Sequence, residues 1–167
     1  MQIAVMFSVV CTVYMLILSG CSSVEKPSIK VGVGETVITP EMDDVPMRGY
    51  AARNSTGVHD ELYARSLVIE DAEGTGAVLM TIALCNLRVA FMERIRDAVN
   101  EATGIPVENV IISCTHTHSG PHVSRAGEEY QEFLIARAAE SAVSAWNSRV
   151  SGRIGSTATI CRGLGMN

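Results

Sequence analysis

The sequence contains no cluster of Lys and Arg residues, no internal repeat and no low-complexity tract. Its 167 residues carry a formal net charge of -5 at pH 7, with a pI of about 5.3. A nucleic-acid surface needs clustered cations to neutralise phosphates, so this composition argues against a nucleic-acid partner. Hydrophobic residues make up 47% of the chain and charged residues 19%. These proportions are typical of a globular chain that forms one domain of ordinary size, or a piece of a larger one.

The first 20 residues lack any charged side chain. The apolar run within them, Ile3–Leu18, is too short for a comfortable bilayer span, which favours a signal peptide over residues 1–20. It ends in the tetrapeptide LSGC at residues 18–21, which resembles the lipobox of bacterial lipoproteins. The resemblance implies that Cys21 carries a lipid. We therefore expect an exported protein of the bacterial cell envelope that is anchored to a membrane.

One feature of this N-terminal segment departs from the usual pattern. No Lys or Arg precedes the apolar run, so only the amino terminus supplies a positive end. An uncleaved membrane anchor therefore stays open as an alternative. In both cases the rest of the chain leaves the cytoplasm and remains tethered to a membrane. Residues 21–28 then form a short polar tether, and residues 29–167 form the remaining domain.

Three of the four histidines, His116, His118 and His122, lie within seven positions. They follow the β-branched run Val110–Ile112, which predicts a buried strand. Side chains two apart on a strand share a face, so we expect His116 and His118 to project together from its C-terminal end. Open α/β sheets usually carry their chemistry at this end. The pair can offer two ligands to one Zn²⁺, or one ligand and one group that faces the substrate.

The cysteines that remain after the export segment are Cys85, Cys114 and Cys161. Three thiols allow one disulfide and one free cysteine, but the sequence specifies no pairing. Cys114 lies two residues before His116, so a Cys-x-His-x-His metal cluster is conceivable. A small buried strand residue is the favoured interpretation of Cys114.

The apolar pattern of the remaining chain predicts alternating strands and helices. Besides the strand before the histidines, the expected strands cover residues 29–38, 62–70, 77–84 and 153–160, and the expected helices cover residues 89–103 and 127–147. Residues 41–57 contain Pro46, Gly49 and Gly57 and predict an extended loop. Because the later strands are joined through helices, we expect an α/β fold, with α+β as the alternative, in which helices pack on a mixed β-sheet.

The strands at 62–70 and 77–84 flank the turn-rich segment DAEGTG and predict a β-hairpin. The second of these strands is apolar nearly throughout. Such a composition is expected for a central strand that is covered on both faces.

Three segments in a fixed order resemble the N-terminal part of the neutral/alkaline, non-lysosomal ceramidase family. They are KVGVGETVITP, VPMRGYAARNSTGVHDELYARSLVIED and TGIPVENVIISCTHTHSGPH. The similarity runs from about Lys30 to the end of the chain, and its most specific element is THTHSGP after an ENV-type strand. It implies that residues 29–167 are the N-terminal portion of a larger catalytic domain.

The resemblance implies a zinc amidohydrolase that splits ceramide-like lipids into a fatty acid and a sphingoid base. The first histidine of the family's HTH motif is a zinc ligand, which carries over onto His116. His118 is expected beside the metal, in contact with the substrate or with the attacking water. The family's other ligands, a second histidine, a glutamate and a tyrosine, lie further along than this chain reaches. We therefore expect the chain as given to hold an incomplete and inactive site.

Further residues are candidates for substrate binding or for supporting the site. His59 matches a family position, and it is expected either to line the site or to organise its loop together with Asp60. Asn86 stands where family members generally carry an acidic residue, so it keeps hydrogen bonding but not charge. Arg53 and Arg65 could bind a polar head group, although isolated arginines more often anchor loops or lie on the surface.

The sequence leaves two other functions open. A barrel amidohydrolase also carries a His-x-His pair after a strand. Such a barrel should show repeated strand and helix units from its start, which the loop predicted at residues 41–57 fits poorly. A non-catalytic surface lipoprotein would keep the fold without the metal.

Overall fold

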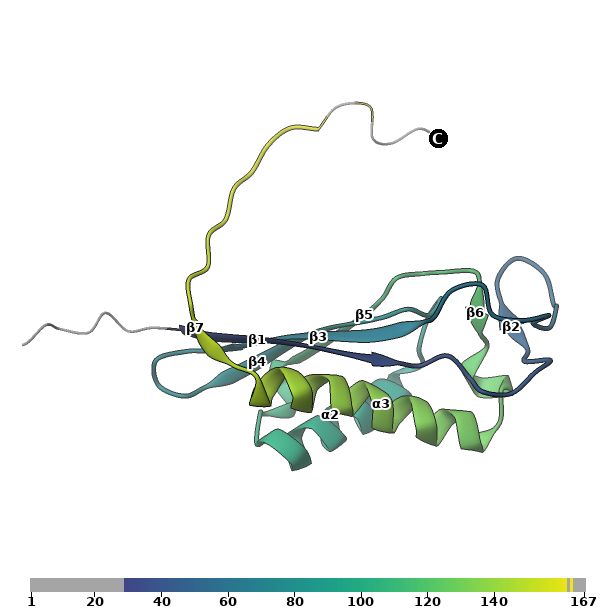
Figure 1. Cartoon of the computed structure of the whole chain (residues 1–167), viewed down its shortest axis with the longest axis horizontal. Coiled ribbons are helices and arrows are strands. Elements are labelled where there is room, and N and C mark those ends of the chain that lie inside the picture. Colours follow the sequence, from purple (N-terminus) through teal and green to yellow (C-terminus); the bar gives the residue numbers. More distant parts are fainter. Residues whose placement is uncertain (1–28, 162, 164–167) are drawn as a thin grey trace, which may run out of the picture.

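The computed structural model describes residues 29–161 and 163, so the predicted signal peptide, Cys21 and the tether lie outside the described residues. The chain forms a five-stranded sheet in the order β5-β4-β3-β1-β7, and two helices cover one face of it (Figure 1). The strands of this sheet are β1 (Ile29–Val37), β3 (Tyr63–Glu70), β4 (Gly76–Ile82), β5 (Val110–Cys114) and β7 (Val150–Gly152), and the helices are α2 (Val89–Thr103) and α3 (Glu128–Asn147). A second small sheet pairs β2 (Met47–Arg48) with β6 (Gly120–Pro121).

The sheet is mixed, as the sequence predicts. β1, β3 and β4 pair antiparallel, β7 pairs antiparallel with β1, and β5 runs parallel to β4. A parallel pair needs a crossover connection, and α2 supplies it between β4 and β5. The predicted α/β class with packed helices is therefore confirmed. None of the helices within the described part of the chain combines the length and the apolar character needed to cross a bilayer.

Helix α2 follows the sequence prediction residue for residue. Its apolar face buries Ile95 and Val99 completely. It ends at Gly104, which takes the left-handed conformation at φ 74° and donates its N–H to the carbonyl of Asn100 at 2.8 Å. A glycine is suited to this position because it has no Cβ to oppose a positive φ.

Helix α3 lies very close to β1, and two glycines permit this approach. A Cβ on Gly32 would lie 1.9 Å from the carbonyl oxygen of Ala145, and one on Gly34 would lie 2.1 Å from that of Ser141. Both obstacles are backbone atoms, which cannot swing aside. The helix therefore packs against the backbone of β1 rather than on a layer of its side chains.

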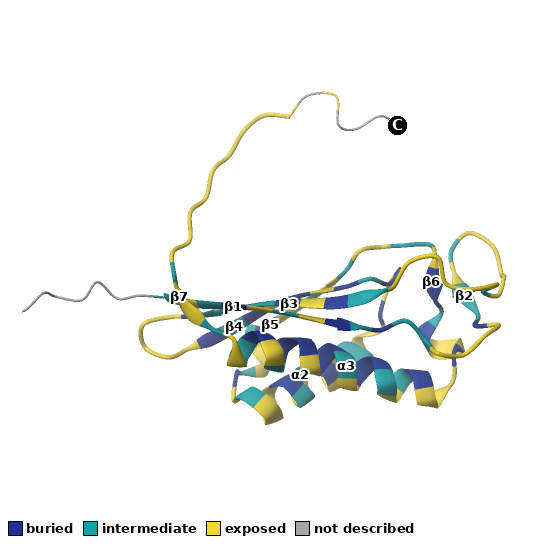
Figure 2. Ribbon diagram, in the orientation of Figure 1, coloured by how far each residue is buried: buried dark blue, intermediate teal, exposed yellow. Residues whose placement is uncertain are grey.

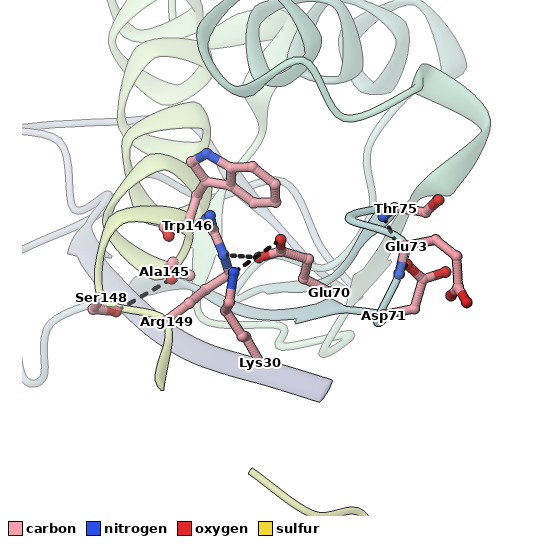
Figure 3. A network of polar contacts seen from close by, with 9 residues as sticks. All are labelled: Lys30, Glu70, Asp71, Glu73, Thr75, Ala145, Trp146, Ser148 and Arg149. Carbon is pink, nitrogen blue, oxygen red and sulfur yellow. Dashed lines mark hydrogen bonds and ion pairs between the residues drawn. The ribbon is translucent and has the colours of Figure 1, made fainter. Parts of the chain in front are cut away.

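An ion-pair cluster closes the end of the sheet where β1 begins (Figure 3). The carboxylate of Glu70 accepts from Arg149 Nε at 2.6 Å and from Lys30 Nζ at 3.2 Å, while the Arg149 guanidinium lies over the Trp146 ring. Burial would raise the pKa of Glu70, but the hydrogen bonds and charges of Arg149 and Lys30 hold it below its ordinary value of 4.5. The cluster joins β3, β1 and the end of α3.

Two sequence predictions about strands need correction. Residues 153–160 form no strand: the final strand is β7, and the residues after it are exposed. The register pairs Gly152 with Ile29, where the described part of β1 starts, so residues 153–160 have no described strand to pair with. β4 is internal in the sheet, as predicted, but only one of its faces is covered, and Leu79 remains 42% exposed.

Candidate metal centre

The histidine segment leaves β5 alongside the chain that continues from β4. After the parallel pairing ends at Cys114, Thr115 donates its N–H to the carbonyl of Ile82 and His116 donates its N–H to that of Leu84, both at 3.0 Å. These two bonds extend the contact between neighbouring strand ends beyond the sheet. They fix the backbone of the first histidine at the C-terminal ends of β4 and β5, where the sequence predicts the site.

His116 has an uncommon backbone conformation and a defined ring orientation. Its φ is 64°, in the left-handed region that non-glycine residues seldom adopt. Its Nδ1 lies 2.9 Å from the carbonyl oxygen of Cys85. A carbonyl can only accept, so Nδ1 carries the proton and Nε2 keeps the lone pair. This is the arrangement in which metal-binding histidines are usually held by their surroundings.

His118 lies beside His116, and two residues of the predicted 41–57 loop hold it. The centroids of the two imidazole rings are 4.9 Å apart, at an interplanar angle of 65°. Arg53 Nη2 donates to the carbonyl of His118 at 2.5 Å, and the edge of the Tyr50 ring meets the His118 ring with a centroid distance of 4.4 Å. The backbone and the ring of His118 are therefore both positioned by residues far away in the sequence.

The loop predicted at residues 41–57 is fastened to the histidine segment through the β2–β6 pairing. Arg48 pairs with Gly120, and His122 donates its N–H to the carbonyl of Pro46 at 2.7 Å. Nε2 of the His122 ring also lies 3.2 Å from Nη1 of Arg48. The third histidine of the cluster thus contacts β2 and takes no part in the pair formed by His116 and His118.

One group of described residues could hold a metal ion, namely Cys85, His116 and His118, whose ligand atoms all lie within 4.8 Å of one another. Zinc bonds of about 2.0–2.3 Å place neighbouring ligand atoms roughly 3–4 Å apart, so the cluster is slightly wide. The Cys85 sulfur lies 3.8 Å from His116 Nδ1, the nitrogen that already donates to a carbonyl. The thiol therefore lies next to the nitrogen of His116 that is already used in a hydrogen bond.

The other predicted site residues are placed differently. His59 is exposed, bonds Asp60 through Nδ1 at 2.8 Å, and lines a cavity together with Thr117 and Ser119. Asn86 is exposed directly after Cys85. Arg65 pairs with Glu35 on the sheet.

Cys114, the cysteine weighed as a ligand from the sequence, is half-buried at the end of β5 and packs against the hydrophobic core. Burial raises the pKa of its thiol; a hydrogen bond with the Leu87 backbone partly opposes this increase, and the neighbouring Cys85 adds a smaller one. Cys114 contacts the core and does not belong to the described group that could hold a metal ion.

A cavity of about 890 Å³ borders the same segment. Thr117 and Ser119 line it, whereas His116 and His118 do not. Its remaining lining combines apolar side chains with polar and charged ones, among them His59 and the carboxylates of Glu41, Asp43, Asp60 and Glu61. The cavity is therefore adjacent to the histidine pair but does not contain the candidate metal position.

Sequence reasoning missed two residues of this site. Cys85 approaches His116 because β4 and β5 are neighbours, and Tyr50 approaches His118 because β2 pairs with β6. Neither a cysteine that follows an apolar run nor an isolated tyrosine in a loop indicates such contacts in the local sequence. Arg53 was predicted to bind a head group or, more commonly for such a residue, to anchor a loop, but the sequence did not indicate that it bonds the His118 carbonyl.

Comparison with known proteins supports the family resemblance. Residues 29–138 match the family described as neutral/alkaline non-lysosomal ceramidase, N-terminal. The neutral ceramidase of Oryza sativa subsp. japonica is 33% identical over 117 residues, which cover 64% of this chain and 14% of that protein. The neutral ceramidase of Mycobacterium tuberculosis is 29% identical over 102 residues, or 56% of this chain and 16% of that protein.

A solved structure shows the same fold. The crystal structure of neutral ceramidase from Pseudomonas aeruginosa matches with a TM-score of 0.70 and 26% identity, covering 77% of this chain and 23% of that one. The chain thus spans less than a quarter of the length of each of these relatives.

Proposed function

The chain belongs to the neutral/alkaline non-lysosomal ceramidase family, and from this premise we propose that it contributes to a zinc-dependent active site for ceramide-like lipids. The reaction adds water across the N-acyl amide bond and releases a fatty acid and a sphingoid base. The observation that carries the proposal is the geometry of His116 and His118: two adjacent imidazoles at the ends of β4 and β5, with Nε2 of the first left free.

His116 is the proposed zinc ligand. Its Nδ1–H group bonds the Cys85 carbonyl, which fixes the tautomer and leaves Nε2 as the atom that would bind the metal. A bound Zn²⁺ supplies a water of pKa near 7 and polarises the amide carbonyl. Catalytic zinc uses three protein ligands or more, so further ligands are required. By the family resemblance, we expect them in a part of the polypeptide beyond this chain.

His118 is the proposed residue for proton transfer. Its ring is close enough to that of His116 to contact the attacking water or the substrate carbonyl. An imidazole there can take a proton from the water and deliver it to the departing amine nitrogen. Arg53 and Tyr50 hold His118 in place, so their contribution is to its position.

The lipobox-like LSGC segment adds a proposal for location. A lipid on Cys21 would hold the enzyme at the membrane of a bacterial envelope, next to a lipid substrate. Cys21→Ser in the complete natural polypeptide should prevent lipid attachment and release or misprocess the protein, whereas wild type should partition into detergent. Unchanged membrane retention of the variant would support the uncleaved anchor instead.

The decisive experiment uses the complete natural polypeptide that contains this chain. His116→Ala should remove stoichiometric zinc and the release of fatty acid from ceramide together. His122→Ala is the matched control, because that ring contacts Arg48, and it should retain the metal. A His116→Ala protein that keeps zinc and activity would refute the assignment. Zinc-dependent cleavage of other N-acyl amides, without cleavage of ceramide, would keep the metal site and change the substrate.

A further inference from the structure

The 41–57 loop lies directly on the backbone of His118. Arg53 bonds the His118 carbonyl, and the Tyr50 ring meets the His118 ring. A Cβ on Gly49 would lie 3.2 Å from the His118 carbonyl oxygen, so the two segments are in close contact. The position of His118 therefore depends on whether this loop stays in place.

The strand pairing that holds the loop is short. β2 and β6 have two residues each, and their register joins Met47 with Pro121 and Arg48 with Gly120. A two-stranded pairing by itself is marginally stable in water. Figure 2 shows exposed loop residues around β2 beside the buried strand β6. One side-chain contact therefore weighs in the balance between the bound and the released loop.

The hydrogen bond between Arg48 and His122 is a contact of this kind. Nη1 of Arg48 lies 3.2 Å from Nε2 of His122. A guanidinium has donors and no acceptor, so Nε2 accepts and the imidazole is neutral, with its proton on Nδ1. A second proton, on Nε2, would remove the acceptor and place two cations side by side. The bond therefore exists while His122 is neutral and is lost when the ring is protonated.

The charged groups around His122 do not offset this effect. Arg48 faces the ring from β2, and Arg125 of the short helix η2 (Val123–Arg125) donates its N–H to the His122 carbonyl. Both side chains are cations. Asp44 in the loop is bonded within the loop, and no ion pair among the described residues joins a carboxylate to His122. A positive charge on His122 thus has cationic neighbours.

His122 is the member of the Arg48–His122 bond that titrates near neutral pH. Histidine side chains change charge between about pH 5 and 8, whereas arginine stays protonated throughout this range. The bond from Arg53 to the His118 carbonyl joins an arginine to a backbone group, so it does not itself respond to pH. A pH change thus acts on the attachment of the loop through His122.

We propose that His122 is a pH-sensitive positioning residue for His118. Neutral His122 holds the 41–57 loop on the histidine segment, and protonation breaks the bond to Arg48 and releases Arg53 and Tyr50 from His118. The release of the loop follows from the contact itself. Its effect on turnover rests on the proposed function.

Hydrogen exchange of the complete natural polypeptide tests the release at about pH 8 and about pH 5.5, with rates corrected for the intrinsic pH dependence of exchange. Peptides that cover residues 41–57 and 117–124 should lose protection at least about threefold at the lower pH, because the hydrogen bond to a charged group is lost. Peptides from β1 and β3 should keep their protection.

Three variants isolate His122 from other groups that titrate, including any zinc ligand. In His122→Gln the amide oxygen accepts from Arg48 at both pH values, so protection of the two peptides should stay high. His122→Lys carries a permanent cation, so protection should be low at both. His59→Gln is the matched control, because His59 bonds Asp60 rather than Arg48, and it should behave as wild type.

Equal protection of the wild type at both pH values, or an undiminished loss in His122→Gln, would overturn the proposal. A loss that extends to the peptides of the large sheet would indicate general unfolding and overturn it as well.

Turnover of an N-acyl sphingoid substrate provides the second readout. Between the two pH values, kcat/KM should fall at least about threefold more for wild type than for His122→Gln. Equal falls would overturn the positioning role. Absence of turnover in every variant at both pH values would refute the proposed function, and hydrogen exchange would still decide whether His122 holds the loop.

Discussion

The Nδ1 atom of His116 lies 2.9 Å from the backbone carbonyl oxygen of Cys85 and 3.8 Å from the thiol sulfur of the same residue. Because the carbonyl accepts the Nδ1 proton, Cys85 orients the histidine through its main chain. The side chain of Cys85 contributes packing. The N–H of His116 donates to the carbonyl of Leu84, and this bond stabilises the positive φ of His116.

Cys85→Ala should therefore leave zinc stoichiometry unchanged, since the carbonyl remains. The lost buried sulfur should cost about 1 kcal/mol of unfolding free energy. Metal analysis and chemical denaturation of the complete polypeptide check both parts. Loss of zinc with the fold intact would show that the thiolate is itself a ligand.

Arg53→Ala should impair turnover without removing the metal. The guanidinium holds the carbonyl of His118, and a charge-assisted bond at an exposed position should be worth about a factor of ten in kcat/KM. Arg94→Ala is a matched control, because Arg94 pairs with Glu132 between the helices. If both variants retained full kcat/KM, Arg53 would have no role in positioning His118.

Gly34→Ala should destabilise the fold by about 1–3 kcal/mol, because the added Cβ would overlap the carbonyl oxygen of Ser141. Gly155→Ala serves as the control, since a Cβ there meets nothing within 4 Å. Urea denaturation of both variants measures the difference. Equal stabilities would mean that α3 can move away from β1 at little cost.

Glu70 should contribute to stability in a pH-dependent way. Its pKa is lowered in the folded state, so its contribution is fully present above the unfolded pKa of about 4.5 and is lost as the pH falls through the folded pKa. Glu70→Gln should lower the unfolding free energy at pH 7 and reduce the loss of stability below about pH 5. Denaturant midpoints at several pH values provide the measurement, and parallel pH profiles for variant and wild type would contradict the ion-pair account.

The local pattern of the sequence determined most of the secondary structure. The helical spacing of apolar residues located α2 from Val89 to Thr103, and alternation around DAEGTG located the β3–β4 hairpin. The strand at 153–160 was predicted on the same grounds and was wrong, because a strand also requires a partner edge. Propensity acts within a few residues, whereas pairing depends on what lies alongside.

The sequence by itself determined the helices, the hairpin and the histidine pair, since each depends on neighbours in the chain. Only the tertiary structure brought Cys85 to His116, 31 residues apart, and Arg53 to His118, 65 residues apart. The parallel register of β4 with β5 makes the first contact, and the β2–β6 pairing makes the second. The fold likewise decided that one face of β4 stays open. A strand that is apolar on both faces predicts two covering layers, but it does not specify which elements provide them.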